Sequence, residues 1–102
     1  MVAAVALHPN VAAEYSSIEE PDVAIDEIAE LARQPRVRAV GETGLDYFRT
    51  PPELQELQRH SFKRHIEIAK QNNLALVIHD RDAHKDVLKV LEEVNAKHFK
   101  LF

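Results

Sequence analysis

The stretch that decides the fold is residues 37–46, with the sequence VRAVGETGLD. It begins with a short run rich in Val and Ala, Val37–Val40, and continues into a polar segment that holds two glycines and two carboxylates. Similar apolar runs occur at Val2–Leu7 and Leu74–Ile78, so the three runs start 35 and 37 residues apart. Short apolar runs of this kind are typical of strands that are buried on both faces of a parallel sheet.

Helical patterns fill the spaces between these runs. Apolar residues recur at three- and four-residue spacing in Asp22–Arg33, Pro52–Asn72 and Asp82–Glu93, and Asp82 is the expected N-cap of the last helix. The order β-α-β-α-β-α predicts an α/β fold with a parallel sheet, either open or closed into a barrel. Because three strands cannot close a barrel, we expect two sheet edges without partners and self-association of the chain.

A histidine or a carboxylate follows each predicted strand. His8 follows the first strand, Glu42 the second and His79 the third. The carboxyl ends of parallel strands meet at one edge, so these side chains are expected to lie close together. Imidazole and carboxylate are suitable ligands for ions such as Zn²⁺ or Mn²⁺, and a middle-strand carboxylate could bridge two ions. The alternative is structural: Glu42 capping a turn, His79 hydrogen-bonded in the core and His8 in a turn.

Other polar residues near the strand ends have two interpretations. Arg49 and Arg81 could bind phosphate oxygens in a bidentate manner, or they could form a solvated surface pair. Gly41 and Gly44 are expected to permit a turn after the second strand. The remaining four histidines are expected to be surface or packing residues: His60, His65, His84 and His98.

Composition limits the classes of protein to consider. The 102 residues make about one domain, and 17 acidic against 13 basic residues give a net charge of -4. That balance argues against a purely electrostatic nucleic-acid binder. The chain has no cysteine, which excludes a disulfide scaffold and a thiol nucleophile. No apolar run approaches the roughly 20 residues of a membrane span, and the N-terminus is too short for a signal peptide. We therefore expect a cytoplasmic protein.

Two longer motifs resemble a known family. Val40–Tyr47 (VGETGLDY) and Leu76–Ala83 (LVIHDRDA), with Gln58 and Phe62 between them, are similar to the TatD family of metal-dependent deoxyribonucleases. The opening segment Ala6–Pro9 (ALHP) resembles that family's Gly-hydrophobic-His-Pro segment, with Ala6 in place of the glycine. An open flavodoxin-like domain that binds a small anion also fits the order of elements, but it leaves these motifs unexplained.

The resemblance implies a TIM (β/α)8 barrel with two divalent ions (Mg²⁺, Mn²⁺ or Zn²⁺) and a DNA substrate. By this resemblance, Glu42 is the glutamate that bridges the two metals and His79 is a ligand of one of them. Both residues are then also catalytic. His8 lies near the substrate, and Arg81 and Asp82 support the rim, which is the edge of the sheet at which the strands end.

The chain lacks parts of the family pattern. It contains no His-x-His motif, which in the family supplies two further ligands. Residues 1–102 are therefore expected to form a partial barrel domain of three β-α units, with 95–102 as a divergent tail. A chain of this extent, with part of the site, is expected to be inactive alone. The alternative is a non-catalytic truncated remnant or assembly module.

Overall fold

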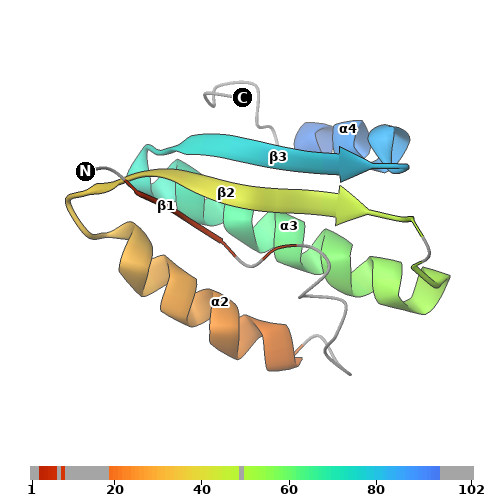
Figure 1. Ribbon diagram of the computed structural model, residues 1–102, viewed down its shortest axis with the longest axis horizontal. Coiled ribbons are helices and arrows are strands. Elements are labelled where there is room, and N and C mark those ends of the chain that lie inside the picture. The colour runs from red at the N-terminus through yellow and green to blue at the C-terminus, as the bar shows by residue number, and fades with distance from the viewer. Residues whose placement is uncertain (1–2, 7, 9–18, 49, 95–102) are drawn as a thin grey trace.

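The computed structural model describes residues 3–6, 8, 19–48 and 50–94. Three strands and three helices alternate along these residues (Figure 1). None of the described helices is long and apolar enough to cross a membrane. The elements are β1 (Ala3–Val5), α2 (Glu19–Ala32), β2 (Val37–Asp46), α3 (Pro52–Asn72), β3 (Ala75–Arg81) and α4 (His84–Glu93).

The three strands form one sheet in the order β1-β2-β3, and both pairs are parallel. Val5 pairs with Val40 in the first ladder, and Gly44 pairs with His79 in the second. All three strands therefore run in the same direction and end at the same side of the molecule, as the arrows of Figure 1 show. The expected α/β architecture of parallel β-α units is confirmed.

The prediction of a turn at Gly41 and Gly44 is wrong, because β2 continues through both glycines to Asp46. The reason is the close approach of β3. A Cβ atom at Gly44 would overlap the carbonyl oxygen of His79, and one at Gly41 would overlap the Cβ atom of Val77. Gly44 also has φ of 138°, which side-chain-bearing residues rarely adopt. The glycines thus allow two backbones to pack closely rather than allowing the chain to reverse.

Helix α3 has the bounds that the sequence predicts, and α4 does not. Pro52 is the first residue of α3, where its missing N–H costs nothing, and Asn73 ends the helix in the left-handed conformation with φ of 52°. Asp82 was expected to be the N-cap of α4, and this is wrong: its φ is 56°, and the N-cap is Ala83, which makes no side-chain capping bond. Helix α2 begins at Glu19, before the predicted start.

The helices bury one face of the sheet. Helix α3 lies along the sheet beneath β2 (Figure 1), and Phe62 and Ile66 of this helix are completely buried together with Val40, Leu45 and Leu76 of the strands. Burying a large apolar side chain contributes roughly 1.5–3 kcal/mol, so this layer supplies much of the stability.

Residues along β3 alternate in direction. Leu76 belongs to the core cluster and the partly buried Ile78 packs against it, whereas Val77 and His79 are outside that cluster. The alternation places His79 on the side of the sheet away from the helices.

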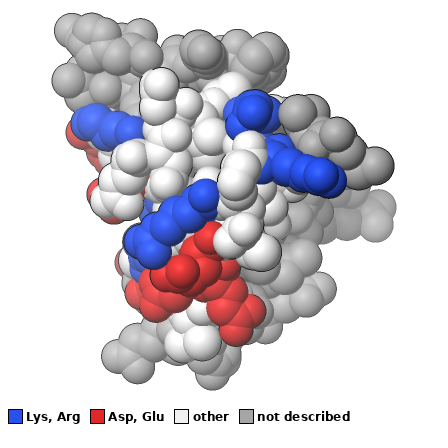
Figure 2. All heavy atoms as spheres, turned by 90° about the vertical axis from the view of Figure 1, so that its left-hand side faces the viewer, with Lys and Arg blue, Asp and Glu red and all other residues white. Residues whose placement is uncertain are grey.

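The end of the molecule at which the strands begin carries charges of both signs. Figure 2 looks onto this end and shows basic and acidic side chains beside one another. Near the C-terminal end of α2, the charged atoms of Glu30 and Arg33 lie 2.8 Å apart. Among the residues that the structure describes, this view therefore shows no broad basic surface of the kind that binds nucleic acid through charge alone.

Candidate metal centre

The three strands bring His8, Glu42 and His79 together. His8 follows β1, Glu42 lies in the middle of β2, and His79 lies near the end of β3. Glu42 Oε1 is 3.2 Å from His8 Nε2 and 3.1 Å from His79 Nδ1. The two imidazole rings meet edge to face, with 4.7 Å between their centroids and 62° between their planes. The sequence-predicted juxtaposition therefore exists in the folded chain.

The donor atoms fit a divalent cation. One ligand atom from each of the three residues lies within 4.8 Å of the others. Ligands of a single zinc ion, each about 2.0–2.2 Å from the metal, lie up to roughly 4.4 Å apart, so the contacts of Glu42 suit a shared ion. Two imidazoles and one carboxylate are a donor set for Zn²⁺ or Mn²⁺ more than for Mg²⁺, which prefers oxygen ligands. The Glu42 side chain is 49% exposed, so an ion from solution can reach it.

Asp46 is the residue of this site that sequence reasoning missed. Its Oδ2 lies 2.9 Å from Nε2 of His79, on the opposite side of the ring from Glu42. Asp46 is only 3% exposed, although it carries a charge when ionised. One signal was available in the sequence: an acidic residue directly follows the apolar Leu45 at the end of the second strand. That pattern places Asp46 at the edge where the strands end, but it does not identify His79 as its partner.

Arg81 is the last residue of β3, two positions after His79. The guanidinium carbon of Arg81 stands 3.9 Å from the centroid of the Phe48 ring, and the Arg81 side chain is exposed. Asp80 points the other way and contacts His84 of α4, with 2.9 Å between Oδ2 and Nδ1. Arg49 lies outside the described residues.

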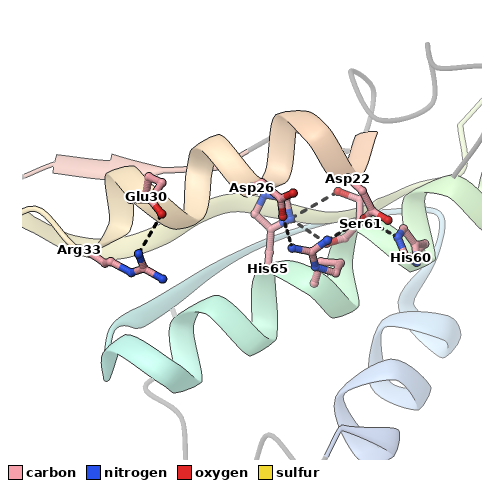
Figure 3. A network of polar contacts seen from close by, with 8 residues as sticks. Asp22, Asp26, Glu30, Arg33, His60, Ser61 and His65 are labelled. Carbon is pink, nitrogen blue, oxygen red and sulfur yellow. Dashed lines mark hydrogen bonds and ion pairs between the residues drawn. The ribbon is translucent and has the colours of Figure 1, made fainter. Parts of the chain in front are cut away.

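A second group of histidines and carboxylates joins α2 to α3. Asp22 of α2 contacts Nε2 of His60 at 2.7 Å and accepts a hydrogen bond from Arg64 at 2.8 Å, while Arg64 also bonds to Asp26 at 2.9 Å (Figure 3). Burial opposes ionisation of Asp22, but the contacts with His60 and Arg64 outweigh it and lower its pKa below the ordinary value. This group is an interhelical ion-pair network.

The prediction that the other histidines are surface or packing residues is confirmed for the three that the structure describes. His65 is completely buried, and its Nδ1 lies 2.7 Å from the carbonyl oxygen of Ser61. Burial lowers the pKa of His65 to about 4, so the ring is neutral at neutral pH. His60 and His84 are paired with carboxylates at the surface, and His98 lies outside the described residues.

The chain matches the TatD related DNase family over residues 1–102. It is 42% identical over 99 residues to an uncharacterized metal-dependent hydrolase TatD of Mycobacterium tuberculosis, covering 92% of this chain and 35% of the relative. It is 38% identical over 89 residues to a 3'-5' ssDNA/RNA exonuclease TatD of Citrobacter koseri, covering 84% of this chain and 31% of the relative.

A solved structure gives the same result for the fold. The crystal structure of YJJV, a TatD homolog from Escherichia coli K12, superposes with a TM-score of 0.65 at 29% identity, covering 92% of this chain and 35% of that one. The chain thus spans about a third of the length of these relatives. The expected fold class, parallel β-α units that form part of a (β/α)8 barrel, is confirmed. The chain belongs to the TatD related DNase family.

Proposed function

We propose that this chain is part of a divalent-metal-dependent phosphodiester hydrolase that acts on DNA, and that it carries part of the active site. The observation that supports the proposal is the convergence of His8, Glu42 and His79 at the shared edge of three parallel strands. Names of relatives that include "metal-dependent hydrolase" and "ssDNA/RNA exonuclease" add to it. We propose DNA, single strands included, as the substrate class.

The proposed roles follow from position. Glu42 and His79 hold the metal, and Glu42 has a second carboxylate oxygen with which it could bridge to another ion. When bound, divalent ions supply Lewis acidity toward a phosphoryl oxygen during in-line displacement. His8 stands at the edge of the ion position, 3.2 Å from Glu42, where its imidazole can hydrogen-bond a phosphate oxygen. Arg81, and Arg49 by its place in the sequence, contribute positive charge to the phosphates that flank the cleaved bond.

The proposal separates the chain alone from the chain in a complete barrel. Two protein ligands leave most coordination positions of an ion to water, so the isolated chain should bind divalent ions weakly and hydrolyse no DNA. A chimera in which this chain replaces the matching segment of the Citrobacter koseri exonuclease supplies the other ligands. We expect the chimera to degrade a 3'-labelled single-stranded oligonucleotide when Mn²⁺ or Mg²⁺ is present.

The matched control is the same chimera with Glu42→Gln, which keeps the shape of the side chain and removes its charge. It should fold like the parent and show no metal-stimulated degradation. A folded parent chimera that leaves the oligonucleotide intact with every divalent ion would contradict the proposed function.

The edges of the sheet favour a second candidate, a non-catalytic assembly module. In the described sheet, β1 and β3 each pair with β2 on one side only. Unpaired strands are templates for association with another chain. Analytical ultracentrifugation of this chain over a concentration series measures this directly. Self-association together with an inert chimera would favour the assembly role, and a stable cooperative monomer would exclude it.

A further inference from the structure

Polar contacts to the backbone of Asp46 and to both of its carboxylate oxygens hold it in one orientation. Its backbone N–H donates to Oε1 of the buried Gln58 at 2.8 Å, and its carbonyl oxygen accepts a hydrogen bond from the Thr50 hydroxyl at 3.0 Å. Its Oδ1 accepts a hydrogen bond from the backbone N–H of Phe48 at 3.1 Å. The other carboxylate oxygen, Oδ2, therefore has a fixed position, and it is the oxygen that faces Nε2 of His79 at 2.9 Å.

The contact between Asp46 and His79 has a chemical consequence. An ionised carboxylate only accepts hydrogen bonds, and a neutral imidazole carries one N–H and one lone pair. A short contact to Asp46 Oδ2 therefore places the proton of the neutral ring on Nε2. The lone pair of His79 is then on Nδ1, which points at Glu42 Oε1 from 3.1 Å. Of the two carboxylates, Asp46 is the one that is almost completely buried, so its demand for a donor is the stronger.

We propose that Asp46 is the positioning residue of the metal centre: it sets the tautomer and the orientation of the His79 ring so that Nδ1 presents its lone pair to a divalent ion shared with Glu42. The role as a ligand of that ion rests on the proposed function, whereas the tautomer is a property of the chain without metal. A carboxylate that accepts the second N–H of a metal-bound histidine both orients the ring and raises its basicity.

Asp46→Asn tests the proposal because an amide has one acceptor and one donor end. If the amide oxygen continues to accept the Phe48 N–H, the amide nitrogen faces His79 Nε2 and donates to it. The neutral ring must then carry its proton on Nδ1, so the lone pair no longer points toward Glu42. The matched control is Asp80→Asn, which changes the neighbouring carboxylate that contacts His84 on the other face of β3.

The first readout is the tautomer of His79 in the metal-free chain. Two-bond ¹H–¹⁵N correlation spectra, recorded at a pH high enough to make the ring neutral, distinguish a protonated Nε2 from a protonated Nδ1. We expect protonated Nε2 in the wild-type chain and in Asp80→Asn, and protonated Nδ1 in Asp46→Asn. A wild-type ring protonated on Nδ1 would overturn the proposal without any variant, as would an unchanged tautomer in Asp46→Asn.

The second readout is affinity for Zn²⁺, measured by competition with a chromophoric chelator. Loss of an outer partner of a metal-bound histidine typically weakens binding about 10–100-fold, and we expect a loss in that range for Asp46→Asn and none for Asp80→Asn. Equal Zn²⁺ affinity in Asp46→Asn and wild type would overturn the positioning role. A wild-type chain with the expected tautomer that binds no Zn²⁺ would instead overturn the metal-presenting part of this proposal. The ring orientation would stand, and so would the proposed function, which the chimera tests separately.

Discussion

The rim of the sheet and the α2–α3 interface both combine histidines with carboxylates, but they balance charge differently. At the interface, Asp22 and Asp26 share the guanidinium of Arg64, which is always charged, and the hydrogen bond to Asp26 helps to raise the pKa of Arg64. At the rim, Glu42 is paired with His8 and His79, which are charged only when protonated.

This difference separates a structural network from a candidate metal site. A guanidinium cannot be displaced from its carboxylates by a metal ion without leaving its own charge unpaired, and it offers no lone pair. Neutral imidazoles do offer lone pairs, and they leave the negative charge of a shared carboxylate available to a cation. The composition of the two groups is similar, so the choice between arginine and a second histidine decides which group can bind metal.

The largest expected effect is on metal binding at the rim. His79→Ala and Glu42→Ala each remove a proposed ligand of the ion. Loss of a residue that only hydrogen-bonds to a ligand already weakens metal binding about 10–100-fold, so loss of a ligand itself should bring Zn²⁺ binding below detection. Isothermal titration calorimetry measures it. The control is Asp22→Asn, which removes a carboxylate from the interface and should leave binding unchanged. Loss of Zn²⁺ binding in Asp22→Asn but not in His79→Ala would reverse the comparison.

Gly44→Ala should damage the rim through the backbone. The added Cβ would overlap the carbonyl oxygen of His79, and the backbone at φ of 138° is unfavourable for alanine. Strain and overpacking of this kind each cost about 1–3 kcal/mol, so we expect the free energy of unfolding to fall by roughly 2–6 kcal/mol. Urea denaturation followed by circular dichroism provides the value, and an unchanged midpoint would show that β2 and β3 are not packed as described.

The stability of the folded chain should fall in acid because of His65. The ordinary histidine pKa of about 6.5 applies in the unfolded chain, while the pKa in the folded chain is about 4. Between these values the unfolded chain binds a proton that the folded chain excludes, so stability is complete above about pH 6.5 and is lost as the pH falls toward 4. The loss amounts to roughly 3 kcal/mol. The comparison with His65→Gln isolates it, since that variant should lack this part of the pH dependence; parallel curves for both proteins would contradict the account.

Arg64→Met should destabilise the interface and leave the rim intact. The variant keeps much of the aliphatic packing but leaves Asp22 and Asp26 without the guanidinium that pairs with them. Removing one partner from a partly buried charged hydrogen bond costs about 1–3 kcal/mol, which thermal unfolding can detect. Zn²⁺ affinity should stay at the wild-type value. A fall in Zn²⁺ affinity that matched His79→Ala would show that the two regions are coupled.

Among the three residues of the candidate metal centre, His8 should matter least for metal binding when it is replaced by alanine. If His8 contacts the substrate, the variant keeps near-wild-type Zn²⁺ affinity, and in the exonuclease chimera it raises the KM for the oligonucleotide more than it lowers metal affinity. If Zn²⁺ affinity falls as far as in His79→Ala, His8 is instead a third ligand, as its 3.2 Å distance from Glu42 Oε1 permits.

Periodicity predicted most of the fold because local pattern and tertiary packing agree there. The apolar stripe around Phe62 and Ile66 both favours a helix and faces the sheet, so the bounds of α3 are the same in sequence and structure. The shared edge of His8, Glu42 and His79 followed from parallel strand order alone.

The missed features depend on contacts between distant segments. Gly-Glu-Thr-Gly has the composition of a turn, and only the approach of β3 explains why β2 continues through it. Asp46 is buried next to Gln58, twelve residues later, which accepts a hydrogen bond from its backbone N–H. A single sequence does not encode that contact in any local pattern. Asp82 has the residue type of an N-cap, yet its left-handed backbone places it before the helix.

The most direct test of the account is the position of a bound ion. Crystals of this chain grown with Zn²⁺ and measured on both sides of the zinc absorption edge locate the metal without reference to any assay. The account predicts an anomalous peak between Nδ1 of His79 and Oε1 of Glu42, with Nε2 of His79 still bonded to Asp46. A peak beside Asp22 and Asp26, or zinc bound through Nε2 of His79, would contradict it.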